Sequence, residues 1–95
     1  MDDLGTRRTP PMKQILLVED NADNRDLVFA FLDADYDIKA CVDGFEAIEE
    51  LKPETGYMPD IILCDISLPG MDGVELLRKL RQETRFAKLP CIALT

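Results

Sequence analysis

The chain has 95 residues, of which 11 are basic and 19 acidic, and its formal net charge is −8. A chain of this length suits one domain, and its acidic surface would repel a nucleic-acid backbone. The sequence has no histidine, which excludes Ser-His and Cys-His nucleophilic chemistry. Its apolar runs are too short for a membrane span, so we do not expect it to bind a membrane. Because of its negative charge, we do not expect it to bind nucleic acid either.

The first segment, residues 1–12, is polar, contains two adjacent prolines and lacks the apolar core of a signal peptide. It is typical of a flexible leader, which leaves residues 13–95 as the folded domain and predicts a cytoplasmic protein. Three cysteines lie in apolar segments and have no histidine to complete a zinc site, so we expect buried, reduced thiols. They are Cys41, Cys64 and Cys91.

In chain order, short apolar segments typical of strands alternate with amphipathic segments typical of helices. The predicted strands are Lys13–Asp20, Asp37–Val42, Asp60–Cys64 and Pro90–Thr95. The second strand is the most polar, as edge strands often are. The residues predicted to face inward are Leu27, Val28, Phe31 and Leu32 in the first helix, Phe45, Ile48 and Leu51 in the second, and Val74, Leu77 and Leu80 in the third.

The second and third helices share a start signal. Asp43 and Asp72 each precede a glycine, and a glutamate follows three positions after each aspartate, at Glu46 and Glu75. This is the spacing of a capping box, in which the aspartate accepts a hydrogen bond from the first turn of the helix. The two motifs therefore mark helix starts.

The order β-α-β-α-β-α-β predicts an α/β fold with a doubly wound parallel sheet and helices on both faces. In a parallel sheet the carboxyl ends of all strands lie at the same rim. Glu19 and Asp20 end the first strand, Asp65 follows the third, and Thr95 ends the fourth. We therefore expect these four residues to converge.

Clustered carboxylates repel one another unless a cation or proton is present. Their hard oxygen ligands suit Mg²⁺, which also favours phosphoryl transfer to a neighbouring carboxylate. Two members of the set allow simpler interpretations, because Asp20 can cap the first helix and Thr95 can be an ordinary strand residue. Asp65 has no capping role, because Pro69 and Gly70 separate it from the next helix.

With these motifs in place, the sequence resembles the receiver domain of two-component response regulators. The matching segments are ILLVEDN at Ile15–Asn21, IILCDISLPGMDG at Ile61–Gly73 and PCIALT at Pro90–Thr95. The resemblance runs from about Lys13 to the last residue. It implies a flavodoxin-like doubly wound sheet that is incomplete here, because it stops at the fourth strand.

The resemblance also implies roles for single residues. Asp65 would be the phosphoacceptor and Thr95 the switch hydroxyl. Glu19, Asp20, Asp65 and the backbone carbonyl of Ser67 would bind Mg²⁺. A histidine kinase or phosphotransfer protein would donate the phosphoryl group, and a downstream protein partner would read the result. Such a domain is a phosphoacceptor in a phosphorelay rather than a turnover enzyme.

The sequence departs from the family after the fourth strand, because it lacks the later strand that carries a lysine. Arg25 is the nearest candidate to replace that cation. The fourth strand becomes an uncharged apolar edge, so we expect a homodimer through it or low stability. The alternative is a truncated interaction module that is not phosphorylated. An aspartyl phosphohydrolase is disfavoured because Ser67 replaces the usual second acid, and a flavodoxin because no phosphate loop follows the first strand.

Overall fold

The structure, a computed structural model, describes residues 12–68 and 70–94. Of the predicted leader, residues 1–12, only the last residue is described, and Pro69 and the predicted switch residue Thr95 also lie outside the described residues. The strands are β2 (Gln14–Val18), β3 (Asp37–Cys41), β4 (Ile61–Asp65) and β5 (Cys91–Leu94). The helices are α1 (Ala22–Leu32), α2 (Gly44–Glu50), α3 (Gly73–Arg81) and two short 3-10 helices, η1 (Pro53–Thr55) and η2 (Thr84–Phe86).

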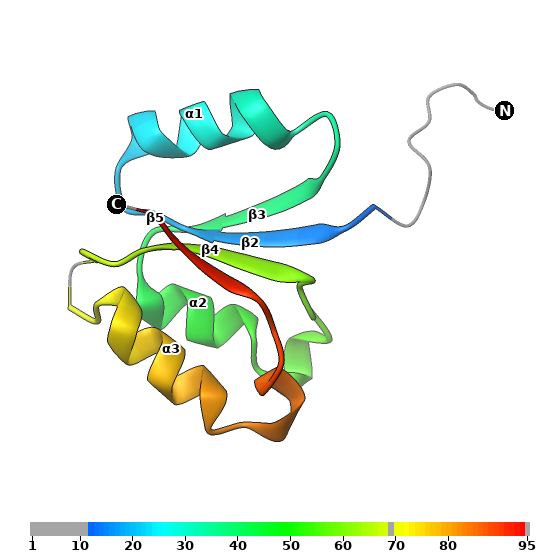
Figure 1. Ribbon diagram of the computed structural model, residues 1–95, viewed down its shortest axis with the longest axis vertical. Coiled ribbons are helices and arrows are strands. Elements are labelled where there is room, and N and C mark those ends of the chain that lie inside the picture. Colours follow the sequence, from blue (N-terminus) through cyan, green and yellow to red (C-terminus); the bar gives the residue numbers. More distant parts are fainter. Residues whose placement is uncertain (1–11, 69, 95) are drawn as a thin grey trace, which may run out of the picture.

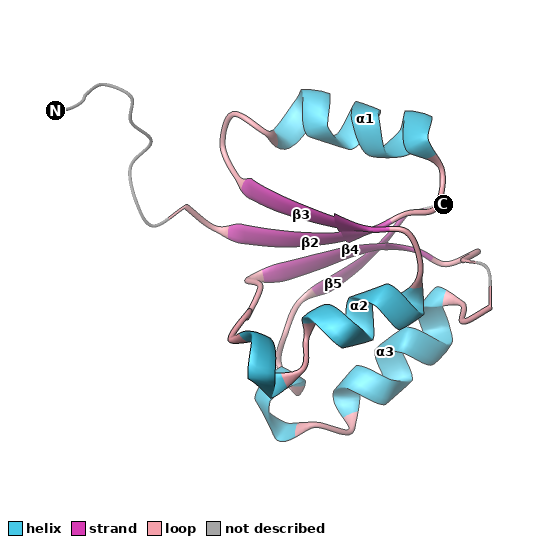
Figure 2. Cartoon of the chain, turned by 180° about the vertical axis from the view of Figure 1, so that it is seen from behind, coloured by secondary structure: helices cyan, strands magenta, loops and turns pink. Residues whose placement is uncertain are grey.

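The four strands form one parallel sheet in the order β3-β2-β4-β5, and this confirms the predicted incomplete doubly wound sheet. Helix α1 covers one face of the sheet, and α2 and α3 cover the other (Figure 1). The view from behind shows the same three layers, with η1 and η2 near one end of the strands (Figure 2). No helix in the described part of the chain is long and apolar enough to cross a membrane.

The alternation of side chains along the strands divides the core into two clusters. Leu16 and Val18 of β2 face α2 and α3, where they pack with Leu51 and Leu76. The other face of the same strand carries Ile15 and Leu17, which pack with side chains of α1. The central strand is therefore buried on both faces, as a continuous apolar run in a parallel sheet predicts.

All three predicted helix faces are wrong in part. In α1, Val28 and Leu32 pack against the sheet together with Phe29, whereas Leu27 and Phe31 are 56% and 74% exposed. The apolar residues of this 11-residue helix form two overlapping apolar faces, and packing against the sheet decides which of the two faces is buried.

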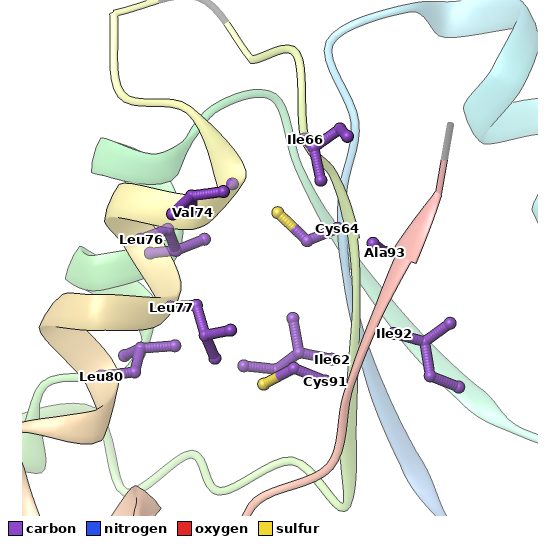
Figure 3. Close-up of a pocket in the computed structure, with 11 residues that line it drawn as sticks. Ile62, Cys64, Ile66, Val74, Leu76, Leu77, Leu80, Cys91, Ile92 and Ala93 are labelled. Carbon is purple, nitrogen blue, oxygen red and sulfur yellow. The ribbon is translucent and has the colours of Figure 1, made fainter.

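The third helix shows a similar shift. Leu76 and Leu80 are its buried leucines, and the predicted inward residues Val74 and Leu77 are 57% and 36% exposed. These two side chains instead help to line an apolar cavity of about 150 Å³ between α3 and β5. Figure 3 shows Leu77 pointing toward Ile62 and Cys91, and Val74 pointing toward Cys64. In α2, the predicted inward residue Phe45 is also exposed.

The predicted helix starts are confirmed. The Asp43 side chain accepts a hydrogen bond from the Glu46 N–H at 2.8 Å, and Asp72 accepts one from the Glu75 N–H at 2.8 Å. The Glu46 carboxylate in turn accepts from the Val42 N–H at 3.0 Å. These bonds satisfy donors that the helices themselves leave unpaired.

Candidate functional site

Three acidic side chains meet at the carboxyl ends of β2 and β4. The two strands are adjacent and parallel, with Val18 opposite Cys64, so Glu19 and Asp65 both follow this matched pair. One carboxylate oxygen from each of Glu19, Asp20 and Asp65 lies within 4.8 Å of the others. The structure therefore brings together the three acids that the sequence predicted to converge.

Glu19 is the most tightly held member of this acidic cluster. It is 3% exposed, and its carboxylate accepts a hydrogen bond from the Asn21 N–H at 3.1 Å. Its own N–H donates to the Cys41 carbonyl at 2.9 Å. The Arg25 side chain donates to the Glu19 carbonyl at 2.9 Å, so the only cation that the sequence placed near the site contacts its main chain. The Glu19 carboxylate is therefore buried and held in place at the cluster by a main-chain donor.

Asp20 is exposed and has no capping role. The N-cap of α1 is Asn21, whose side chain accepts from the Asn24 N–H at 2.9 Å. The interpretation of Asp20 as a helix cap is therefore wrong, because the next residue fills that position. Helix capping therefore does not explain why Asp20 lies beside the carboxylates of Glu19 and Asp65.

Asp65, the last residue of β4, is half-buried. The Ser67 N–H donates to its Oδ1 at 2.9 Å, which places Ser67 beside the cluster. The loop after Asp65 returns to the start of α3, where the Gly73 N–H donates to the Ile66 carbonyl at 3.2 Å. These short-range bonds hold the Asp65 side chain and the loop that follows it at the rim of the sheet.

A cavity of about 180 Å³ opens beside the acids. Glu19 and Asp65 line it together with Leu27, Val28 and Leu94. Leu94, the last described residue, lies opposite Asp65 in the β4–β5 register. The position of the Thr95 hydroxyl lies outside the described residues.

The donor set at this site is chemically simple. Three carboxylates within 4.8 Å of one another repel unless a cation or proton compensates them. Carboxylate and carbonyl oxygens are the ligands that Mg²⁺ takes, usually one or two from the protein, with water and phosphate oxygens completing the shell. The residues therefore fit a hard divalent cation.

Sequence reasoning missed two supporting residues. Asn21 both caps α1 and donates to Glu19, and its signal is an asparagine directly after the acid pair with Asn24 three residues on. Gly73 lets α3 begin against the Asp65 main chain, because an added β-carbon would lie 3.0 Å from the Asp65 carbonyl oxygen. A glycine directly after the Asp72 cap was visible in the sequence, but nothing local indicated what it would contact.

Comparison with known proteins gives one consistent family. The model of the response regulator receiver domain matches residues 15–95. The chain is 35% identical over 88 residues to protein-glutamate methylesterase/protein-glutamine glutaminase 3 of Rhodopseudomonas palustris, covering 90% of this chain and 23% of that protein. It is 35% identical over 83 residues to response regulator Rre1 of Synechocystis, covering 85% and 35%. The chain thus spans about a third or less of these relatives.

Solved structures similar to this chain belong to the same family. The phosphorylated cyanobacterial phytochrome response regulator RcpA superposes with a TM-score of 0.79 at 29% identity, covering 86% of this chain and 64% of that one. The receiver domain of sensor histidine kinase PA1611 from Pseudomonas aeruginosa, described with a magnesium ion in its active-site cleft, gives 0.78 at 34% identity, covering 88% and 67%.

Proposed function

Because the chain belongs to the response regulator receiver domain family, we propose that Asp65 accepts a phosphoryl group from a histidine kinase or a phosphotransfer protein. A carboxylate oxygen of Asp65 forms the bond to phosphorus while the bond from phosphorus to the donor's imidazole nitrogen breaks, and that nitrogen keeps the electron pair. The observation that carries the proposal is the meeting of Glu19, Asp20 and half-buried Asp65 within 4.8 Å.

Glu19, Asp20, Asp65 and the backbone carbonyl of Ser67 are the proposed Mg²⁺ ligands. A bound Mg²⁺ would screen the negative charge of the incoming phosphoryl group. The magnesium ion in the related PA1611 receiver supports this part of the proposal. Within this chain, Glu19 is held in place by Asn21, while Asp20 is exposed at the rim and accessible to a hydrated ion. In this proposal Glu19 is the ligand that the fold holds in place, and Asp20 is the ligand that a hydrated ion can reach from solvent.

Thr95 is the proposed switch residue. Its hydroxyl would donate a hydrogen bond to a phosphoryl oxygen on Asp65. The support is its place in the chain directly after Leu94, which pairs with Asp65 in the sheet register and lines the same cavity. A change at the end of β5 would reach the surface that a downstream protein partner reads.

The domain acts in this proposal as a phosphoacceptor and not as a turnover enzyme. The same meeting of carboxylates weighs against the alternative of an interaction module that is never phosphorylated. We also infer that the chain self-associates through β5, the fourth strand of the sequence prediction, whose four residues carry no charge.

The test is incubation with Mg²⁺ and a small phosphodonor such as acetyl phosphate, followed by intact mass and peptide mapping. We expect one phosphoryl group, located on Asp65 and lost when a chelator removes Mg²⁺. Asp65→Asn should abolish the adduct. Asp33→Asn, at the exposed C-terminal end of α1, should keep it and serves as the matched control. An adduct that persists in Asp65→Asn would contradict the proposal.

A further inference from the structure

Arg25 connects the first helix to the turn that carries two members of the acidic cluster. Its own N–H donates to the Asn21 carbonyl at 3.0 Å, so Arg25 lies one helical turn after the N-cap of α1. Side chains of a helix lean toward its N-terminus, and the Arg25 side chain therefore reaches back past the cap. There its Nη1 donates to the Glu19 carbonyl at 2.9 Å. This one side chain thus spans the whole turn between β2 and α1.

Asp20 lies inside the turn that this hydrogen bond closes. The peptide group before Asp20 is held through the Glu19 carbonyl, which accepts from Arg25. The peptide group after Asp20 is held through the Asn21 N–H, which donates to the Glu19 carboxylate at 3.1 Å. The Glu19 N–H donates to the Cys41 carbonyl at 2.9 Å and ties the turn to the sheet. The main chain of Asp20 is therefore held on both sides, although its side chain is exposed.

The acidic cluster itself works against this conformation of the turn. Glu19, Asp20 and Asp65 present oxygens within 4.8 Å of one another, and these carboxylates repel before a cation binds. Glu19 is buried and Asp65 is the last residue of a strand, whereas Asp20 is exposed in a turn. Asp20 is thus the member that repulsion would displace most easily. Hydrogen bonds that hold its main chain oppose that displacement.

Helix stability does not explain an arginine at position 25. The amino-terminal end of a helix carries partial positive charge and favours acidic side chains over basic ones. A guanidinium keeps its charge at all ordinary pH values and has five N–H donors. Hydrogen bonds from charged donors are stronger than those from neutral ones. The arginine therefore suits the carbonyl that it contacts in the turn and not the helix that carries it.

We propose that Arg25 is a positioning residue for the Mg²⁺ site. By holding the Glu19 carbonyl, it keeps the Asp20 carboxylate beside the other two acids before the ion arrives. Groups that orient metal ligands in this way contribute roughly 10–100-fold to metal affinity. This role rests on the proposed function only in taking these acids as the Mg²⁺ ligands. All the residues that carry it lie between positions 19 and 65, in the described part of the chain.

Charge and position predict opposite effects of removing the Arg25 side chain. If the guanidinium acted only through its positive charge, it would repel Mg²⁺, and its removal would strengthen Mg²⁺ binding. If it acts by holding the turn, its removal lets Asp20 move away from the other carboxylates and weakens Mg²⁺ binding. The sign of the change in Mg²⁺ affinity therefore decides between the two roles.

The first test measures the dissociation constant of Mg²⁺ by isothermal titration calorimetry, with no phosphodonor present. Arg25→Met has similar helix propensity but no side-chain donor, and it should weaken Mg²⁺ binding about tenfold. Arg25→Lys keeps a charged donor and should restore part of the affinity. Lys13→Met is the matched control, because it removes the same charge from the other end of β2, about 20 Å away along the strand. It should leave the affinity unchanged.

Unchanged or tighter Mg²⁺ binding in Arg25→Met would overturn the proposal, and so would an equal weakening in Lys13→Met. The second test separates positioning from a role in phosphoryl transfer. At low Mg²⁺, Arg25→Met should be phosphorylated by acetyl phosphate more slowly than the wild type. At saturating Mg²⁺ its rate should return to that of the wild type, because only the affinity for the ion is reduced. A rate that stays low at saturating Mg²⁺ would overturn the positioning role.

The Arg25 role and the phosphoacceptor role fail in different ways. A wild-type chain that binds Mg²⁺ but is never phosphorylated would contradict the phosphoacceptor proposal. The calorimetric comparison of Arg25→Met with the wild type would then still support or overturn the role of Arg25. A wild-type chain that binds no Mg²⁺ would overturn the role of Arg25 directly.

Discussion

The start of α3 rests directly on the main chain of the proposed phosphoacceptor. A β-carbon on Gly73 would lie 3.0 Å from the Asp65 carbonyl oxygen and 2.9 Å from the Ile66 α-carbon. Both neighbours are main-chain atoms, which cannot turn aside as a flexible side chain does. The conformation of the loop after Asp65 therefore depends on the absence of a side chain at position 73.

We expect Gly73→Ala to lower the free energy of unfolding by about 1–3 kcal/mol and to reduce the rate of Asp65 phosphorylation. The matched control is Gly44→Ala at the first position of α2, where the nearest atoms belong to the flexible Met71 side chain. Chemical denaturation and phosphorylation kinetics check both effects. Equal loss of activity in the two variants would contradict a specific role for Gly73.

Asp20 and Asn21 are adjacent but should respond in opposite ways. Asn21→Ala removes the α1 cap and should cost about 1 kcal/mol of stability. Asp20→Ala removes one of three mutually repelling carboxylates, so without Mg²⁺ the stability should stay constant or rise. At ten times its dissociation constant, Mg²⁺ should stabilise the wild type by about 1.4 kcal/mol and Asp20→Ala far less. Thermal melts with and without Mg²⁺ measure both effects, and an equal Mg²⁺ response would count against Asp20 as a ligand.

Two phenylalanines test the packing. Phe86 in η2 is 0% exposed and Phe31 in α1 is 74% exposed. Phe86→Ala should cost about 3–5 kcal/mol because it leaves a cavity, whereas Phe31→Ala should change stability by less than about 0.5 kcal/mol. Urea denaturation measures both. A large loss at Phe31 would mean that α1 buries a different face in solution.

Alkaline pH should destabilise the chain through its thiols. Burial raises the pKa of Cys41 to about 12 and that of Cys64 to about 11, from the ordinary value of 9.0. The folded state therefore keeps protons that the unfolded state loses, and the free energy of unfolding should fall as the pH rises from about 9 toward 12. Urea denaturation of the reduced protein at pH 8 and pH 10.5 measures the fall. The control is Cys41→Ala, which should fall less over the same interval.

The sequence predicted the strands and the converging acids well, because each depends on a local pattern. Ile15–Val18 and Ile61–Cys64 are apolar runs that end on acids, and parallel topology alone brings those ends together. The inward face of α1 could not be read in this way, because Phe29 and Phe31 are equally apolar and only the shape of the sheet selects Phe29. Phe86 lies in the polar segment between α3 and β5, where no local pattern indicated a buried residue. Its burial depends on core residues distant in the sequence, such as Leu51, whose carbonyl accepts a hydrogen bond from Arg85.

The hydrogen bond from the Ser67 N–H to Asp65 makes the two carboxylate oxygens unequal. Oδ1 accepts a main-chain N–H from its own loop. In the proposed reaction we therefore expect Oδ2 to form the bond to phosphorus, because an oxygen that already shares a lone pair with an N–H is the weaker nucleophile. A phosphodonor would then approach Asp65 from the side of Oδ2.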